Sequence, residues 1–135
     1  MRYLVDANVL SEVTRPEPNP AVLEWLQKHE RDLVVTPIVL GEIEYGIGLT
    51  ASPRKRKELE LWFAEGMKRL RVVDLDSGTA SVWADLLVRI KKKGRAMPVK
   101  DSLIAASALQ HQLTIVTRNI SDFQNAGVPL INPFE

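Results

Sequence analysis

Apolar residues occur in this chain as short uninterrupted runs, separated by longer stretches in which they recur every three or four positions. The runs are short and rich in β-branched residues, so they predict strands that are buried on both faces of a sheet. They cover residues 3–5, 33–35, 71–73, 114–117 and 128–131. Because Pro129 interrupts the last run, we expect that strand at an edge of the sheet.

A capping residue followed by proline marks the start of several periodic stretches. Asn19-Pro20, Thr36-Pro37 and Ser52-Pro53 each supply an N-cap and a proline at the first helical position. The predicted helices cover residues 7–14, 20–29, 37–49, 53–69, 77–92 and 98–111. Strands alternate with helices, which predicts an α/β fold: one three-layer α/β/α domain over residues 1–135, with a parallel sheet.

Composition removes several kinds of chemistry. The chain has no cysteine, which excludes disulfides, thiolate metal sites and cysteine nucleophiles. This absence is consistent with a reducing cytoplasm, where we expect the protein. No stretch approaches the roughly 18 apolar residues of a membrane helix, so we expect no membrane segment. The net charge is +1, so binding of nucleic acid would depend on local basic clusters.

Two acidic residues follow predicted strands, and ligand sites in such sheets lie beyond the carboxyl ends of the strands. Asp6 directly follows the strand 3–5, although an N-cap of the next helix would explain it equally well. Asp122 follows the strand 114–117 by five residues and is equally consistent with an ordinary loop or cap residue. Asn119 lies closer to that strand end and offers a neutral oxygen.

Two further acids lie on predicted helices. At about 100° per residue, Glu42 shares an apolar helix face with Ile38, Val39, Tyr45, Gly46 and Leu49. A carboxylate buried there needs a metal ion or a salt bridge, and the chain offers 18 basic residues for the latter. Asp101 lies in the first turn of the largely apolar helix 98–111, where the helix dipole also favours an acid.

Carboxylates gathered at one edge of a sheet repel one another, and a divalent cation removes that conflict. We expect Asp6, Glu42 and Asp101 to converge there. Mg²⁺ and Mn²⁺ prefer such oxygen ligands, whereas His29 and His111 lie away from these motifs. The chain has no P-loop, dinucleotide-binding or serine-hydrolase motif. The pattern therefore favours hydrolysis of a phosphodiester by metal-activated water.

Basic residues offer contacts for phosphate groups. The clusters at 54–57 and 91–95 are candidates, and a solvated helix end explains the first of them better. The second precedes Pro98 and Asp101, so it is a candidate to lie near the site. Arg118, beside the expected metal site, is the better candidate for a phosphate contact. No aromatic stacking platform is visible, so the sequence does not indicate which bases are recognised.

Five segments carry more specific motifs. They are RYLVDANVLSE at 2–12, LGE at 40–42, PVKDSLIAA at 98–106, TRNISDF at 117–123 and NPF at 132–134. In this order, over the full length of the chain, they resemble the PIN-domain toxins called VapC, and especially their FitB-like branch. No single motif is decisive, but all five in order are highly specific.

The resemblance implies a Mg²⁺- or Mn²⁺-dependent endoribonuclease, the toxin of a type II toxin–antitoxin system. It also implies a homodimer and inhibition by a cognate VapB-type antitoxin. Asp6, Glu42 and Asp101 match the family's core acids. Many relatives have an acid at the position of Asn119, so the fourth ligand is either Asn119 or Asp122.

Two alternatives remain from the residues alone. A haloacid-dehalogenase-like phosphatase also begins with a strand followed by an aspartate, but it needs an acid two residues later, where this chain has Asn8. A non-catalytic PIN module that binds RNA or a partner protein would not need its acids. The complete set of Asp6, Glu42 and Asp101 argues against that second alternative.

Overall fold

The computed structural model describes residues 1–135, and its centre is a five-stranded sheet in the order β3-β2-β1-β4-β5. All four strand pairs are parallel, as predicted. The strands are β1 (Tyr3–Val5), β2 (Leu33–Val35), β3 (Arg71–Val72), β4 (Thr114–Val116) and β5 (Leu130–Ile131). Strand β5 lies at an edge, which confirms the prediction made from Pro129.

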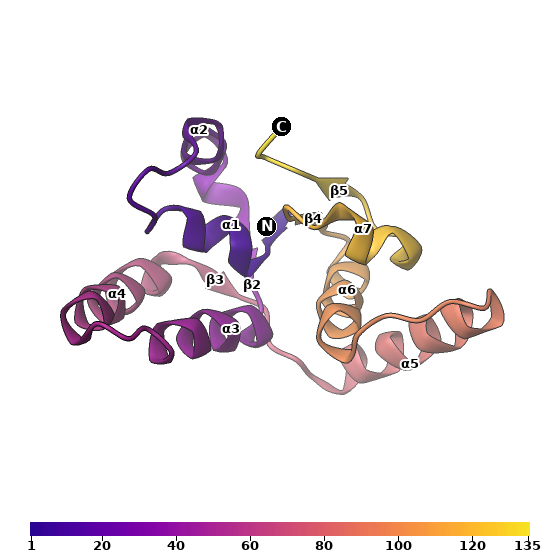
Figure 1. Cartoon of the computed structure of the whole chain (residues 1–135). Helices are drawn as coiled ribbons and strands as arrows, with labels where there is room; N and C mark the ends of the chain where they lie inside the picture. Colours follow the sequence, from indigo (N-terminus) through magenta and orange to yellow (C-terminus); the bar gives the residue numbers. More distant parts are fainter.

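Helices cover both faces of the sheet. They are α1 (Ala7–Glu12), α2 (Pro20–Lys28), α3 (Pro37–Gly48), α4 (Pro53–Gly66), α5 (Ser77–Lys92), α6 (Val99–His111) and α7 (Ile120–Phe123). Short 3₁₀ turns follow α2, α4 and α7, at Glu30–Asp32, Met67–Arg69 and Gln124–Ala126. Figure 1 shows α1 to α4 on one side of the strands and α5 to α7 on the other, which confirms the three-layer prediction. None of the helices combines the length and apolar character required to cross a membrane.

The predicted caps begin their helices. The side chains of Asn19, Thr36 and Ser52 accept backbone hydrogen bonds at the starts of α2, α3 and α4, each with proline at the first helical position. Asp76 caps α5 in a reciprocal capping box with Thr79. These local bonds set where each helix starts, so the sequence predicted the starts more closely than the ends.

The core contains the strands and the helix faces that pack on them. It includes Leu4, Val5, Val34, Ile115 and Val116, all fully buried on the strands. Helix α7 was not predicted from the sequence, because four residues are too few to show a helical period. Its Phe123 is 1% exposed and joins the core, which ties α7 to the sheet beside β4.

Candidate active site

The candidate site lies at the carboxyl end of β1. Strand β1 pairs with β2 on one side and β4 on the other, so the strand order reverses here. A doubly wound sheet opens a crevice at such a switch point, because the helices on either side leave it in opposite directions. Asp6 is the first residue after β1, and its backbone N–H donates to the carbonyl of Val116 at 2.9 Å.

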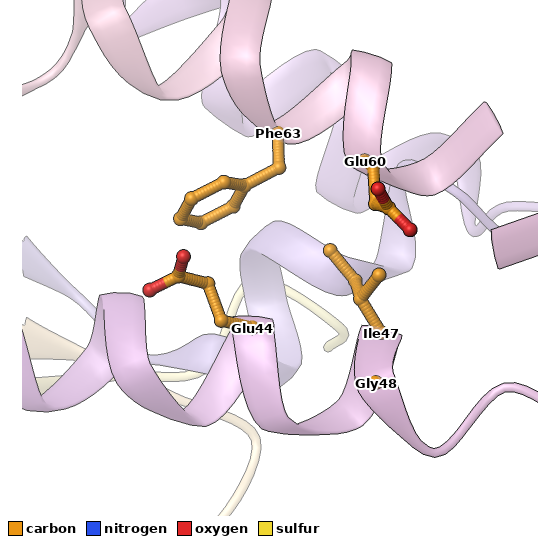
Figure 2. A pocket seen from close by; sticks show the side chains of 5 residues that line it. All are labelled: Glu44, Ile47, Gly48, Glu60 and Phe63. Carbon is orange, nitrogen blue, oxygen red and sulfur yellow. The ribbon is translucent and has the colours of Figure 1, made fainter. Parts of the chain in front are cut away.

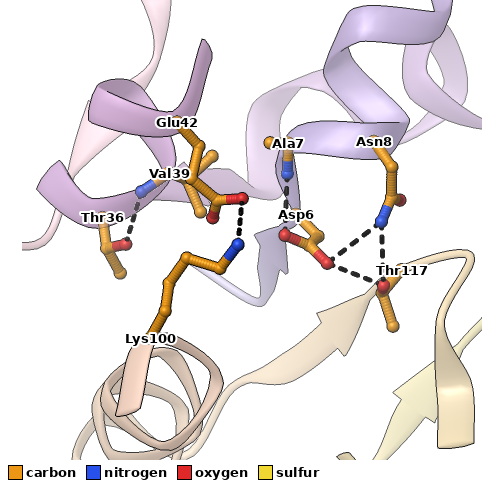
Figure 3. Close-up of polar contacts among 8 residues, drawn as sticks. All are labelled: Asp6, Ala7, Asn8, Thr36, Val39, Glu42, Lys100 and Thr117. Atoms are coloured by element: carbon orange, nitrogen blue, oxygen red, sulfur yellow. Dashed lines mark hydrogen bonds and ion pairs between the residues drawn. The ribbon is translucent and has the colours of Figure 1, made fainter. Parts of the chain in front are cut away.

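Asp6 is 7% exposed, and both of its carboxylate oxygens accept hydrogen bonds. One oxygen accepts the Ala7 backbone N–H at 2.8 Å, so Asp6 is the N-cap of α1. The other accepts the Thr117 hydroxyl at 2.8 Å and the Asn8 side-chain amide at 3.2 Å (Figure 3). Asp6 therefore caps α1 with one carboxylate oxygen, while its other oxygen faces Thr117 and Asn8 at the edge of the sheet.

Thr117 and Asn8 belong to the site but were not among the predicted residues. The Thr117 side chain is fully buried and also accepts the Asn119 backbone N–H at 3.0 Å. The Asn8 side-chain oxygen accepts the Arg118 backbone N–H at 3.0 Å. Both residues share the property that identified Asp6, since each is polar and lies just beyond a strand end.

Glu42 forms an ion pair with Lys100, at 3.0 Å between Oε2 and the ammonium nitrogen. Figure 3 shows the two side chains reaching toward each other from α3 and α6, beside Asp6. The salt bridge considered as the alternative for Glu42 is therefore present. It leaves the other carboxylate oxygen, Oε1, buried and without a hydrogen-bond partner.

The predicted burial of the Glu42 helix face holds for Val39 and was wrong for Tyr45 and Leu49. Tyr45 is 71% exposed and Leu49 is 67% exposed, whereas α3 buries Val39, Ile43 and Ile47. Helix α3 is apolar on two faces, and periodicity alone did not show which of them meets the sheet. Glu42 lies at the boundary between them, with its side chain 24% exposed.

Asp101 lies in the first turn of α6 and is partly buried. Burial is the main reason that the pKa of Asp101 is raised above its ordinary value, and the negative charge of Asp122 is the next. Asp6 and Glu42 raise that pKa further, while Lys100 opposes them. The pKa of Lys100 is raised in turn, chiefly by its hydrogen bond to Glu42. The structure thus brings the four predicted acids into one electrostatic neighbourhood.

The residues after β4 line the same edge. Asp122 is exposed on α7, and Asn119 precedes α7 with no cap bond from its side chain. Arg118 is exposed, and its guanidinium carbon lies 4.8 Å from the centre of the Phe134 ring. Stacking on Phe134 keeps this positive charge near the carboxyl end of β4.

The oxygens at this edge suit a hard divalent cation. Glu42 Oε1 is a buried acceptor that lacks a partner, and the Asp101 carboxylate is destabilised by neighbouring negative charges. In the present side-chain arrangement, however, no three acidic or histidine side chains form a group placed to hold a metal ion. The histidines lie elsewhere, since His29 packs against Trp25 with ring centres 4.4 Å apart and His111 ends α6.

The site is an open edge and not an enclosed cavity. None of the cavities in the structure is lined by any of the four acids. A hollow of about 380 Å³ lies between α3 and α4, lined by Glu44, Ile47, Gly48, Glu60 and Phe63 (Figure 2). We favour the open edge as the functional site because the acids gather there and an extended polymer needs no enclosure.

The basic clusters lie outside this edge. Arg54 and Arg56 form i,i+4 ion pairs with Glu58 and Glu60 at 3.4 and 3.8 Å, as expected for a solvated helix end. The cluster at 91–95 is fully exposed at the outer end of α5, away from β1 in Figure 1. Its predicted proximity to the site is therefore not observed.

Comparison with known proteins identifies relatives over nearly the whole chain. Residues 3–128 match the PIN domain family. Toxin FitB from Neisseria gonorrhoeae is 32% identical over 135 residues, covering 97% of both chains. VapC ribonuclease Y4jK from Sinorhizobium fredii is 32% identical over 139 residues, covering 98% of this chain and 97% of the relative. The crystal structure of FitAcB from N. gonorrhoeae superposes with a TM-score of 0.93 at 31% identity, covering 98% of this chain and 99% of that one.

Proposed function

Because the chain belongs to the PIN-domain family, we propose that it is an endoribonuclease, the toxin of a type II toxin–antitoxin system. The observation that supports this proposal is the position of Asp6 at the switch point of the sheet, with the ion-paired Glu42 and Lys100 reaching the same edge from α3 and α6. Relatives named as a toxin and as a VapC ribonuclease support it. We take residues 1–135 as one PIN domain. The direct test is cleavage of a mixed single-stranded RNA pool that requires Mg²⁺ or Mn²⁺ and stops with EDTA.

Asp6, Glu42 and Asp101 would hold the cation, with Asp122 or Asn119 as the fourth ligand. We propose Mg²⁺ or Mn²⁺, which when bound would activate a water for attack on the phosphodiester. Thr117 and Asn8 orient the Asp6 carboxylate by donating hydrogen bonds to it. Burial and the neighbouring acids disfavour the negative charge of Asp101. A bound cation would stabilise that charge.

The substrate that suits an open edge is a single RNA strand. Arg118, held near β4 by Phe134, would bind a backbone phosphate beside the acids. A phosphatase of the haloacid-dehalogenase type is disfavoured by Asn8, which stands where that class has its general acid. The Asn8 amide donates to Asp6 and its oxygen accepts from Arg118, so both ends of this side chain are already engaged.

The toxin role implies a partner protein. We propose that a cognate VapB-type antitoxin binds this chain and blocks its activity, and that both act in the cytoplasm, where the RNA is. Co-expression with the product of an adjacent small gene should abolish RNA cleavage by the purified complex. Cleavage at an undiminished rate by a stable complex would contradict inhibition by that protein.

We predict a homodimer that forms through the exposed apolar face of α3. Gly41, Tyr45, Gly48 and Leu49 share this face, and a Cβ added at either glycine meets no atom within 4 Å. Close packing against a second copy would bury the exposed Tyr45 and Leu49 in an isologous interface. Light scattering should give twice the chain mass of 15.2 kDa.

Leu49→Glu should give the monomer mass, because it places a charge in this apolar interface. Leu61→Glu is the matched control, since Leu61 is similarly exposed, at 61%, but lies on α4. A monomer mass for the wild type at micromolar concentration would overturn the dimer.

We predict that divalent cations stabilise the fold. A ligand that binds only the native state stabilises it by about 2.7 kcal/mol at one hundred times its Kd. Thermal melts should therefore shift upward with Mg²⁺ or Mn²⁺ and return with EDTA. Asp101→Asn should show a smaller shift, whereas Asp85→Asn, an exposed change on α5, should keep it. Coincident melts with metal and with EDTA would argue against a metal site.

A further inference from the structure

Lys100 is the only basic side chain that forms an ion pair with any of the four acids. It is the second residue of α6, directly before Asp101. A cation in the first turn of a helix is opposed by the helix dipole, so α6 itself does not favour a lysine there. The carboxylate of Glu42, on α3, is what holds its ammonium group.

This pairing leaves Glu42 only half satisfied. Lys100 binds Oε2 at 3.0 Å, whereas the buried Oε1 has no partner. A buried acceptor without a hydrogen-bond partner lowers the stability of the fold. In addition, a single ammonium charge neutralises only part of the charge of several carboxylates. A divalent cation carries twice the charge and accepts several oxygen ligands, so it would satisfy this cluster better than the lysine does.

The ion pair is also easily broken. The Lys100 side chain is 54% exposed, and ion pairs with that degree of solvent contact are weak. Its four-carbon stem rotates freely, and the ammonium has three donors with no fixed geometry. Lys100 can therefore leave Glu42 without disturbing the start of α6, and its charge stays at the same edge of the sheet.

We propose that Lys100 competes with the divalent cation for Glu42 and, once displaced, binds a phosphate of the RNA. This inference rests on the proposed function. In the metal-free protein the ammonium neutralises part of the acid cluster. With the cation bound, the same ammonium faces the anionic backbone of the substrate. Lys100 thus exchanges a carboxylate for a phosphate, which couples metal binding to substrate binding.

The test begins with Mn²⁺ binding in the absence of RNA, measured by isothermal titration calorimetry. Lys100→Gln removes the competing charge and should lower the Kd for Mn²⁺ about fivefold. Lys68→Gln is the matched control, because it removes the same charge from an exposed residue between α4 and β3, and its Kd should equal that of the wild type. Circular dichroism confirms that each variant is folded.

RNA cleavage gives the second measurement. Lys100→Gln should raise the KM for RNA about tenfold, the loss expected for one charged hydrogen bond. Lys100→Arg keeps a positive charge, so its KM for RNA should lie close to the wild-type value. The two effects of Lys100→Gln are opposite in direction, so a merely structural role for Lys100 would not reproduce them.

The outcomes separate this inference from the function on which it rests. If the wild type binds Mn²⁺ and Lys100→Gln binds it no more tightly, competition by Lys100 is overturned. If the KM of Lys100→Gln is unchanged, its contact with phosphate is overturned. If neither the wild type nor any variant binds Mn²⁺, the proposed metal site is overturned, and the role of Lys100 is overturned with it.

Discussion

Replacing Asp6 by asparagine is expected to lower the rate of RNA cleavage by about 10³-fold, with the fold retained. Asparagine keeps the size of the side chain and removes only its charge. Metal-assisted hydrolysis gains several kcal/mol from the cation, and each 1.36 kcal/mol corresponds to a factor of ten in rate. Because the asparagine side chain binds the cation more weakly than the carboxylate, most of this rate gain should be lost. The measurement is cleavage of a mixed single-stranded RNA pool with Mn²⁺.

The hydrogen bonds around Asp6 explain why the variant should fold. Asparagine is as good an N-cap as aspartate, so the bond from the Ala7 N–H is retained. The Thr117 hydroxyl and the Asn8 amide both donate to the other oxygen of Asp6, and both lose that acceptor when an NH₂ group replaces it. Two lost bonds of this kind cost about 2 kcal/mol, less than the stability of a typical small domain.

Asp85→Asn serves as the control for charge, because Asp85 is exposed on α5 and away from the sheet edge. It should cleave RNA at the wild-type rate. Equal cleavage by wild type and Asp6→Asn would reduce Asp6 to a helix cap and remove the basis of the nuclease mechanism. Failure of the folded wild type to cleave any RNA in the pool, with either metal, would favour a non-catalytic module.

Local chemistry made most of the fold predictable. Asn19, Thr36 and Ser52 start their helices through bonds to residues two or three positions ahead, so the sequence contains all that is needed to place them. The strands were predictable for a similar reason, since a run such as 33–35 is apolar on both faces and fits only a covered sheet. Helix α7 was missed because its four residues are too few to show a helical period, and its buried Phe123 packs on a core formed by distant parts of the chain.

The site was less predictable, because its contacts join segments that are far apart in the chain. Asp6 and Asp101 were predicted by their positions at a strand end and a helix start. The partner of Glu42 was not predicted, since any of 18 basic residues fits the sequence and only the packing of α3 near α6 selects Lys100. One local feature did point to it, namely a lysine in a helical turn where the dipole disfavours positive charge.

The exposed face of α3 was also mispredicted, because its burial depends on contacts that the sequence does not show. Tyr45 and Leu49 look like core residues by periodicity, and the monomer leaves them in solvent. A helix with two apolar faces needs two partners, and the sheet supplies only one of them. The error in predicting burial is therefore itself evidence for a second copy, which is why the interface variant Leu49→Glu is placed at this face.

Phe123→Ala is expected to lower the free energy of unfolding by about 3–5 kcal/mol, the range for removing a buried phenyl ring. Phe123 is 1% exposed and is the largest of the fully buried side chains. Small domains have only about 5–15 kcal/mol of stability in total, so this loss is severe. At about 4 °C per kcal/mol, the melting temperature should fall by roughly 12–20 °C.

The melts should be run in EDTA, because a bound cation would offset part of the loss by mass action. Val88→Ala is the control: Val88 is 54% exposed on α5, and its truncation should change stability by less than about 0.5 kcal/mol. Helix α7 contains both Phe123 and Asp122. If α7 depends on this ring, Phe123→Ala should also reduce any contribution of Asp122 to the metal-induced shift. A fall in melting temperature no larger than that of Val88→Ala would show that α7 is held by other contacts.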